Sequence, residues 1–126
     1  MAKLKTLKNK LDRVVSEYVR KRDERDGVFT CVTCCRTLPI SEADAGHFVK
    51  RGHSSTRWLE RNINAQCRRC NRFQDGEQYL HGKAIDKKWG EGTADELIRL
   101  GKQVKKWTES ELRELLSEYQ LKLEGL

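Results

Sequence analysis

Two cysteine pairs constrain the fold of this chain more than any other feature. Cys31-x-x-Cys34 and Cys67-x-x-Cys70 each place two thiols on one side of a tight turn. Zinc accepts four such sulfurs in a tetrahedron at about 2.3 Å. The spacings therefore predict one structural zinc ion per chain, and residues 35–66, which lie between the pairs, would carry any chemistry.

The fifth cysteine, Cys35, is left over by this pairing. An odd count argues against a fully paired disulfide scaffold, and neither a signal peptide nor an apolar run of transmembrane length is evident. We therefore expect reduced thiols and a cytoplasmic location, without a membrane. Cys35 is interpreted as a bystander, because a pair of Cys35 with Cys31 would spoil the two-residue spacing.

The composition favours a small domain that a metal helps to stabilise. The chain has 126 residues, of which 37% are hydrophobic and 36% charged, so burial alone leaves a thin stability margin. We expect zinc to contribute to the free energy of folding. The net charge of +7 favours a polyanionic partner, with nucleic acid ahead of an acidic membrane surface.

Hydrophobic periodicity predicts a single α+β domain over residues 1–126. Apolar side chains recur every three or four positions in residues 3–24, which is typical of an amphipathic helix. The other side of this helix is basic, which fits either a solvated surface or a contact with a DNA backbone. The zinc-bound core follows at residues 28–76, and a helical region at residues 77–124 completes the domain.

Short apolar runs predict the strands of the core. Residues 28–31 form a strand that enters the first cysteine pair, and residues 44–50 and 63–67 form the two strands of a hairpin. Residues 35–43 are expected to be a connection without regular structure. A helical turn that carries Asn71 should follow the last cysteine.

Three helices are expected in the C-terminal region. The first spans Gln78–Trp89 and is closed by a glycine. Its expected inner face is Tyr79, Leu80, Ile85 and Trp89. Capping boxes at Thr93 and Thr108, each with a Glu three residues later, begin the other two. The last helix is acidic with a leucine stripe, so we expect it to pack on the N-terminal helix or on a second subunit, and the stripe permits a homodimer.

A hairpin followed by a helical turn can hold one catalytic metal if each part contributes a ligand. Asp44 and Asn71 are hard oxygen donors in these two places, which suits Mg²⁺ or Mn²⁺ rather than a second zinc. His47 is neutral near pH 7 and is expected to deprotonate a water that attacks phosphorus. Asn62 is expected to hold the His47 ring, with Asn64 as the alternative on the same strand face.

Basic side chains crowd the same segment. Between His47 and Arg72 the only acidic residue is Glu60, an excess of positive charge that is too large for a mixed solvated surface. Binding of a DNA backbone requires such charge. The candidate DNA contacts are Lys50, Arg51, Arg57, Arg61, Arg68, Arg69 and Arg72.

Residues 44–76 resemble the HNH (ββα-metal) nuclease motif, and more closely the lambdoid-phage NinG family, also called Rap, of recombination endonucleases. The elements DAGHF and N-x-x-x-QC-x-x-CN carry the resemblance, which extends through most of the chain. It implies a zinc-clamped ββα-metal core flanked by helices, with His47 as general base, Asn62 as the central asparagine and Asn71 as a metal ligand. It also implies a phage-encoded enzyme that cleaves branched DNA, such as Holliday junctions, in the bacterial cytoplasm.

One position departs from the usual HNH pattern. Most such motifs have a metal ligand immediately before the base, where this chain has Gly46. Asp44 reaches the metal if the strand bulges at Gly46. Otherwise Asn71, a backbone oxygen, waters and the substrate hold the ion, and Asp44 has only a structural role.

Two other functions are compatible with these residues. A non-catalytic zinc-knuckle DNA-binding protein would share the zinc and the basic segment, but it gives no reason for His47, Asn62 and Asn71 to occur together. A general HNH nuclease in phage DNA processing would differ only in its substrate.

Overall fold

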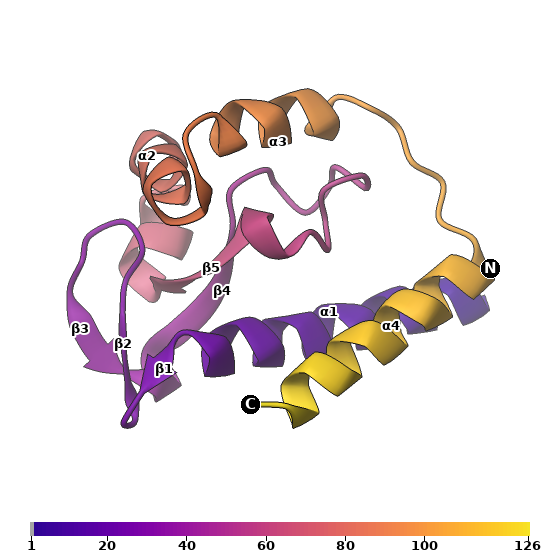
Figure 1. Cartoon of the computed structure of the whole chain (residues 1–126), viewed down its shortest axis with the longest axis horizontal. Helices are drawn as coiled ribbons and strands as arrows, with labels where there is room; N and C mark the ends of the chain where they lie inside the picture. The colour runs from indigo at the N-terminus through magenta and orange to yellow at the C-terminus, as the bar shows by residue number, and fades with distance from the viewer. Residues whose placement is uncertain (1) are drawn as a thin grey trace.

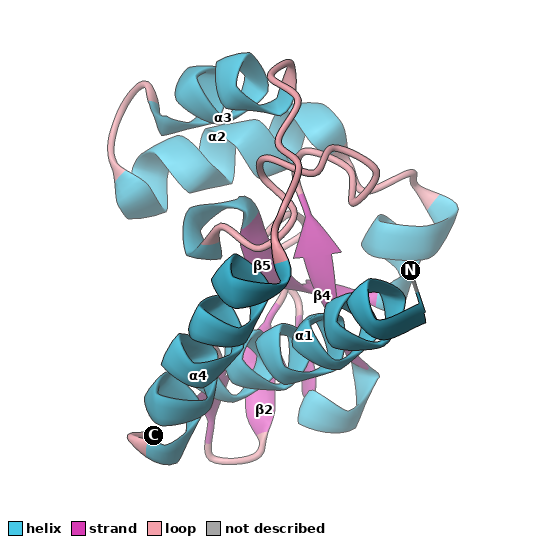
Figure 2. Ribbon diagram, turned by 90° about the vertical axis from the view of Figure 1, so that its right-hand side faces the viewer, coloured by secondary structure: helices cyan, strands magenta, loops and turns pink. Residues whose placement is uncertain are grey.

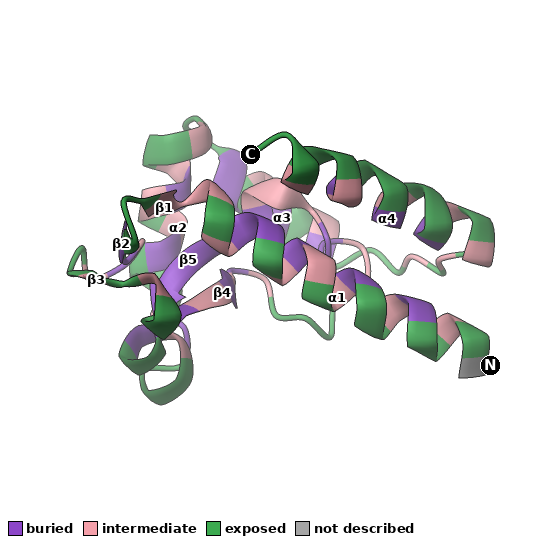
Figure 3. Cartoon of the chain, turned by 90° about the horizontal axis from the view of Figure 1, so that it is seen from below, coloured by how far each residue is buried: buried purple, intermediate pink, exposed green. Residues whose placement is uncertain are grey.

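The N-terminal helix α1 (Ala2–Arg22) runs along one side of the molecule (Figure 1). The structure, a computed structural model, describes residues 2–126, so Met1 of the predicted domain lies outside the described residues. The apolar stripe of α1 is buried and its opposite side is exposed (Figure 3). The buried members are Leu7, Leu11, Val15, Tyr18 and Val19. The predicted N-terminal helix is therefore confirmed.

The last helix, α4 (Glu109–Glu124), lies beside α1 (Figure 2). The side chains that it buries in the shared core are Leu112, Leu116 and Tyr119. Thr108 Oγ1 accepts from the Glu111 amide, and the Glu111 carboxylate accepts from the Thr108 amide, so this capping box is confirmed. The last helix therefore packs on the N-terminal helix of the same chain, which is the first of the two predicted arrangements. Among residues 2–126, no helix is long and apolar enough to cross a membrane.

A three-stranded antiparallel sheet leads into and out of the first cysteine pair. Its strands are β1 (Glu24–Arg25), β2 (Val28–Thr30) and β3 (Thr37–Pro39). β2 confirms the strand predicted at residues 28–31. The expectation of an irregular connection over residues 35–43 is wrong at β3. Leu38 packs with Phe29 in the core around the cysteines, and this brings the backbone of β3 into register with β2.

The second sheet is a hairpin of β4 (Ala43–His47) and β5 (Ile63–Cys67). The strands pair antiparallel without interruption, from Ala43 opposite Cys67 to His47 opposite Ile63. The predicted hairpin is confirmed, although its first strand ends at His47 rather than Lys50. Every position of β5 is buried, so this strand is the centre of the fold.

Gly46 lies in regular pairing opposite Asn64, so the bulge considered as a way to bring Asp44 to the metal does not occur. A Cβ at Gly46 would overlap the side-chain oxygen of Gln66, which is fully buried on the neighbouring strand. The Gln66 amide donates to the Gly76 carbonyl at 2.8 Å, which holds the side chain in this place. Glycine is therefore required because Gln66 fills the space beside it.

Replacement of Gly46 should destabilise the protein. We expect Gly46→Ala to lower the free energy of unfolding by about 1–3 kcal/mol, the usual cost of an overpacked core. Gly52→Ala is the matched control, because nothing lies within 4 Å of a Cβ at that loop position. Urea unfolding of both variants measures the difference, and equal stabilities would contradict the close packing of Gln66 on Gly46.

Helix α2 (Gln78–Trp89) lies on the side of the hairpin opposite α1 and α4 (Figure 1), and its predicted bounds are confirmed. The predicted inner face is wrong in its first turn, where Tyr79 is 75% and Leu80 42% exposed. Ile85 is buried as predicted, and His81 is buried in place of the first-turn residues, because the helix packs on Phe48 through the face that His81 and Ile85 share.

Helix α3 (Thr93–Gly101) follows α2 and packs against it. The capping box predicted at Thr93 is wrong, since Thr93 lies inside the helix and Gly92, at φ 90°, precedes it. The carboxylate of Asp86 accepts from the Ala94 amide at 2.8 Å and so caps the first turn from α2. A side chain from another helix has taken the role expected of a local one.

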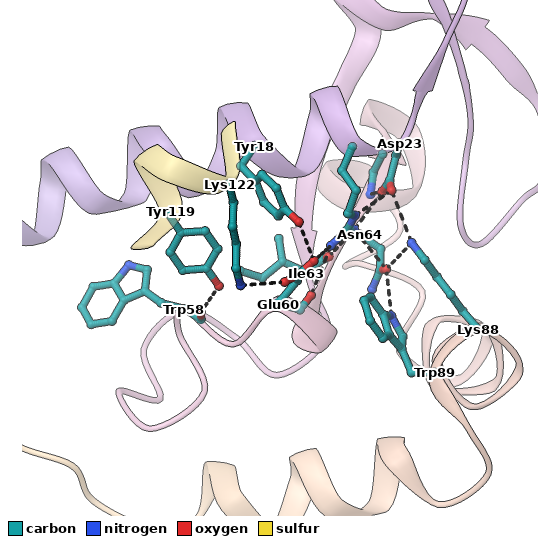
Figure 4. Close-up of polar contacts among 12 residues, drawn as sticks. Tyr18, Asp23, Trp58, Glu60, Ile63, Asn64, Lys88, Trp89, Tyr119 and Lys122 are labelled. Carbon is teal, nitrogen blue, oxygen red and sulfur yellow. Dashed lines mark hydrogen bonds and ion pairs between the residues drawn. The ribbon is translucent and has the colours of Figure 1, made fainter. Parts of the chain in front are cut away.

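A polar network joins the end of α1 to the hairpin, α2 and α4 (Figure 4). Arg22 belongs to α1 but turns inward, donating to the Ile63 carbonyl at 2.9 Å and to Asp23. Glu60 accepts from the Tyr18 hydroxyl at 2.7 Å and from Lys122 of α4 at 3.1 Å. The network therefore fixes both the start of β5 and the turn before it.

Candidate functional site

The four paired cysteines converge on one point. Their sulfurs all lie within 4.8 Å of one another, and all five cysteines of the chain are free thiols. The Sγ atoms of Cys34 and Cys67 are 3.8 Å apart, which matches the separation of roughly 3.8 Å for two sulfurs on one tetrahedral zinc at 2.3 Å. The cluster of Cys31, Cys34, Cys67 and Cys70 can therefore bind a metal such as zinc.

Hydrogen bonds to the sulfurs favour the thiolate form at Cys34. The Cys67 amide donates to Cys31 Sγ at 3.3 Å, and the Arg36 guanidinium donates to Cys34 Sγ and Cys67 Sγ at 3.5 and 3.4 Å. Burial raises the pKa of Cys34, but the hydrogen bonds from Arg36 and from neighbouring thiols lower this pKa to about 6. A thiolate is the form that binds metal. Cys35 is exposed outside the cluster.

His47 projects from the end of β4, with its ring held by a backbone carbonyl. Its Nε2 lies 3.0 Å from the Arg57 carbonyl oxygen. A carbonyl only accepts, so Nε2 carries the proton and Nδ1 keeps a lone pair. Burial lowers the pKa of His47, which favours the neutral ring near pH 7. The expectation that Asn62 holds this ring is wrong, because Arg57 provides the partner.

Asn62 instead stabilises the loop between β4 and β5 through hydrogen bonds. Its amide nitrogen donates to the Val49 and Thr56 carbonyls at 3.0 and 3.2 Å, and its oxygen accepts from the Val49 amide at 2.8 Å. Asn62 is fully buried, so all three bonds are shielded from water. Asn64 has different partners, His81 and Lys88, on the side of the hairpin that α2 covers.

A pocket of about 280 Å³ brings His47 and Asn71 together. Asn71 lies on η3 (Arg69–Phe73), the single helical turn that follows the last strand. The pocket is also lined by Asp12 of α1 and by Lys50 and Arg51 of the loop after β4. An imidazole, an amide and two cations thus share one open cavity at the surface.

Asp44 lies next to this pocket but does not line it. Its carboxylate accepts from the Asn71 side-chain amide at 3.0 Å. Arg72 donates to both oxygens of the same carboxylate, at 2.8 and 2.9 Å, and this guanidinium is exposed. Asp44 and Asn71 therefore meet as predicted, with an arginine as a third member.

Most of the basic residues predicted to bind DNA have acidic or carbonyl partners from elsewhere in the fold. Arg57 pairs with Asp12, Arg61 with Glu96, Lys50 with Asp75 and Arg72 with Asp44, while Arg68 donates to the Ser41 carbonyl. Arg57 is largely buried in its pair and is no longer a candidate for direct contact. Lys50, Arg51, Arg68, Arg69 and Arg72 retain exposed surface.

Asp12 is the acidic residue of the pocket lining, and the sequence did not single it out. It stands beside the apolar stripe of a helix whose outer side is basic, and its side chain is only 14% exposed. A carboxylate at the edge of a buried stripe was the available signal. Arg36 was missed as well, since nothing in the sequence marks it as a partner of the sulfurs.

Comparison with known proteins gives a consistent family. The family model described as "Bacteriophage Lambda NinG protein" matches residues 1–126. Protein ninG of Escherichia phage lambda is 33% identical over 113 residues, which cover 89% of this chain and 53% of that protein. Protein ninG of Salmonella phage P22 is also 33% identical, with 89% and 53% covered.

Protein ninG of Escherichia phage 933W shows the same identity, with 54% of that protein covered. The chain thus spans about half the length of the curated relatives it matches. No solved structure matches. The family model and these relatives together show that the chain belongs to the NinG protein family of lambdoid phages.

Proposed function

We propose that this chain is a divalent-metal-dependent DNA endonuclease of the HNH type that cleaves branched DNA in phage recombination, in the cytoplasm of the bacterial host. The observation that carries the proposal is the pocket shared by His47 and Asn71, in which the His47 ring is anchored at Nε2. A histidine held in this way presents Nδ1 as a base, which is what hydrolysis of a phosphodiester needs.

The order of elements supports the same proposal. β4, β5 and η3 follow one another as two antiparallel strands and a helical turn, the order of the ββα motif. The cysteine cluster joins the end of β5 to η3 and to the turn after β2. A metal in that cluster would hold the turn that bears Asn71 against β5, which pairs with the strand that bears His47.

Asp44 and Asn71 would hold the catalytic ion, because the Asp44 carboxylate meets the Asn71 side chain without any bulge in β4. Both offer oxygen ligands, which suit Mg²⁺ or Mn²⁺, and the hydrogen bond of 3.0 Å from Asn71 Nδ2 to Asp44 Oδ2 places the two side chains side by side. When bound, the ion would supply stabilisation of the charge that develops on the leaving oxygen. Arg72 would exchange Asp44 for a DNA phosphate, since guanidinium binds both groups through the same pair of donors.

The remaining residues would position the substrate and the attacking water. His47 takes the proton of the water at Nδ1, while Asn62 keeps the loop after β4 closed. Lys50 and Arg51 lie at the pocket and would bind the phosphates that flank the scissile bond. A homodimer would present two such pockets to the symmetric strands of a four-way junction.

Cleavage of a labelled four-way junction, compared with a linear duplex of the same sequence, tests the proposal. We expect zinc-loaded protein to cut the junction in preference to the duplex, and only with Mg²⁺ or Mn²⁺ present. Equal cleavage of the two DNAs would support a general HNH nuclease. Binding without any cleavage, by protein whose zinc content has been measured, would support a non-catalytic zinc-knuckle DNA-binding protein.

A further inference from the structure

Asp12 of α1 is saturated with hydrogen bonds at the edge of the pocket. Its Oδ1 accepts from Arg57 Nε at 3.1 Å and from the Trp58 indole at 2.8 Å. Its Oδ2 accepts from Arg57 Nη2 at 2.5 Å and lies 3.8 Å from a nitrogen of Arg51. Both oxygens are thus occupied by protein donors, which makes Asp12 a poor metal ligand despite its place beside the pocket.

The two residues that Asp12 binds are those that present the partner of His47. Arg57 is held at two points. Its side chain donates to Asp12, and its carbonyl oxygen accepts from His47 Nε2. Trp58 is 3% exposed and stacks edge-on against Trp107 at 5.5 Å. The Tyr119 hydroxyl donates to the Trp58 carbonyl. The peptide unit that follows the Arg57 carbonyl is therefore held from several sides.

We propose that Asp12 is a positioning residue for the general base: by holding the Arg57 side chain and the Trp58 indole, it aims the Arg57 carbonyl at His47 Nε2. The imidazole is thereby kept in one tautomer, with the lone pair on Nδ1. The catalytic part of this inference rests on the proposed function, in which His47 is the base. The structural part, the link from Asp12 to the His47 tautomer, does not.

The bidentate ion pair between Asp12 and Arg57 explains why a carboxylate is needed at position 12. Arg57 uses two nitrogens on two oxygens of Asp12, a bidentate arrangement that fixes direction as well as distance. An amide in place of the carboxylate would turn an N–H group toward the guanidinium. The Arg57 side chain would then lose one of its two anchors, and the backbone carbonyl would gain freedom to turn away from His47.

The test combines tautomer measurement with kinetics in the full chain. Nitrogen NMR of the histidine rings should show His47 as a single Nε2-protonated form, assigned by the signal that His47→Ala removes. In Asp12→Asn this signal should shift toward a mixture of tautomers. The value of kcat for junction cleavage should fall by about tenfold or more, a share of what a general base contributes, with KM unchanged.

Three further variants separate this role from general stability. Arg57→Lys keeps the charge but not the bidentate pair, so it should reproduce both effects, and it decides the matter if Asp12→Asn fails to fold. Asp12→Glu should restore part of kcat. Glu17→Gln, on the exposed side of the same helix, should change neither measurement.

The outcomes are distinct from those of the nuclease assay. If the wild-type protein cuts no DNA, the proposed function fails while the tautomer shift still supports the Asp12 link. A single Nε2-protonated tautomer in both Asp12→Asn and Arg57→Lys would overturn the link, whatever the activity. A mixed tautomer with unchanged kcat would confine Asp12 to a structural role and overturn its positioning role.

Discussion

Removal of the metal from the cysteine cluster is expected to unfold this protein. Cys67→Ser, or treatment with a strong zinc chelator, should abolish the cooperative thermal transition measured by circular dichroism. Zinc binding contributes about 10–16 kcal/mol in small zinc-finger peptides, whereas the whole stability of a typical domain is about 5–15 kcal/mol. The loss therefore exceeds what the apolar clusters of a chain with 37% hydrophobic residues can offset.

This loss of stability should be limited to replacement of the four cysteines of the cluster. Cys67 ends β5, and the core around it also contains Phe29 of β2 and Ala43 of β4. Cys35→Ser is the matched control, because Cys35 is exposed and outside the cluster; its stability should change by about 0.5 kcal/mol or less. A Cys67→Ser protein that melts at the wild-type temperature would show that the metal is not a structural element.

Replacement of His47 is expected to abolish cleavage while leaving the fold intact. Loss of a general base lowers kcat by about 10²–10⁴-fold, so His47→Ala should fall to this level or below detection. Zinc content and junction binding should be retained, since the cysteines and the exposed cations are unchanged. Labelled-junction cleavage and a binding titration measure the two quantities. His53→Ala is the control, because His53 is exposed and contacts the Gly101 carbonyl rather than the pocket.

The pH dependence of cleavage gives an independent check on His47. Burial is the main cause that lowers the pKa of this ring, with a further lowering by Arg51. A base acts in its unprotonated form, so a lowered pKa keeps it active to lower pH. The acid limb of kcat/KM should therefore lie below 6.5, the ordinary value for histidine. An acid limb above that value, or wild-type cleavage by His47→Ala, would remove His47 from the mechanism.

Local patterns of the sequence predicted the elements that local interactions create. The helix at α1, the strands β4 and β5 and the capping box of α4 each depend on residues a few positions apart. β3 escaped prediction because its backbone pairs with β2 only through a shared core around the cysteines. The first turn of the inner face of α2 was misplaced for a similar reason, since Phe48 selects the face that carries His81.

The charge balance of the candidate site shows the same limit. The segment between His47 and Arg72 has one acid of its own, and its excess charge predicted a surface for phosphate. The fold brings Asp12, Asp44, Asp75 and Glu96 to these cations from four other segments. Side chains such as Asp12 could not be assigned a role from sequence, because their partners are set by the tertiary structure.

The contact between α4 and the loop before β5 has a consequence for synthesis of the protein on the ribosome. The cysteines, His47 and Asn71 have all been synthesised by the time residue 76 is made, yet Trp58 and Glu60 receive partners from Tyr119 and Lys122. A nascent chain that lacks α4 thus has the candidate catalytic groups without the support that holds their loop in place. The loop that carries the Arg57 carbonyl, the partner of His47, would therefore take its final position only once α4 has been made.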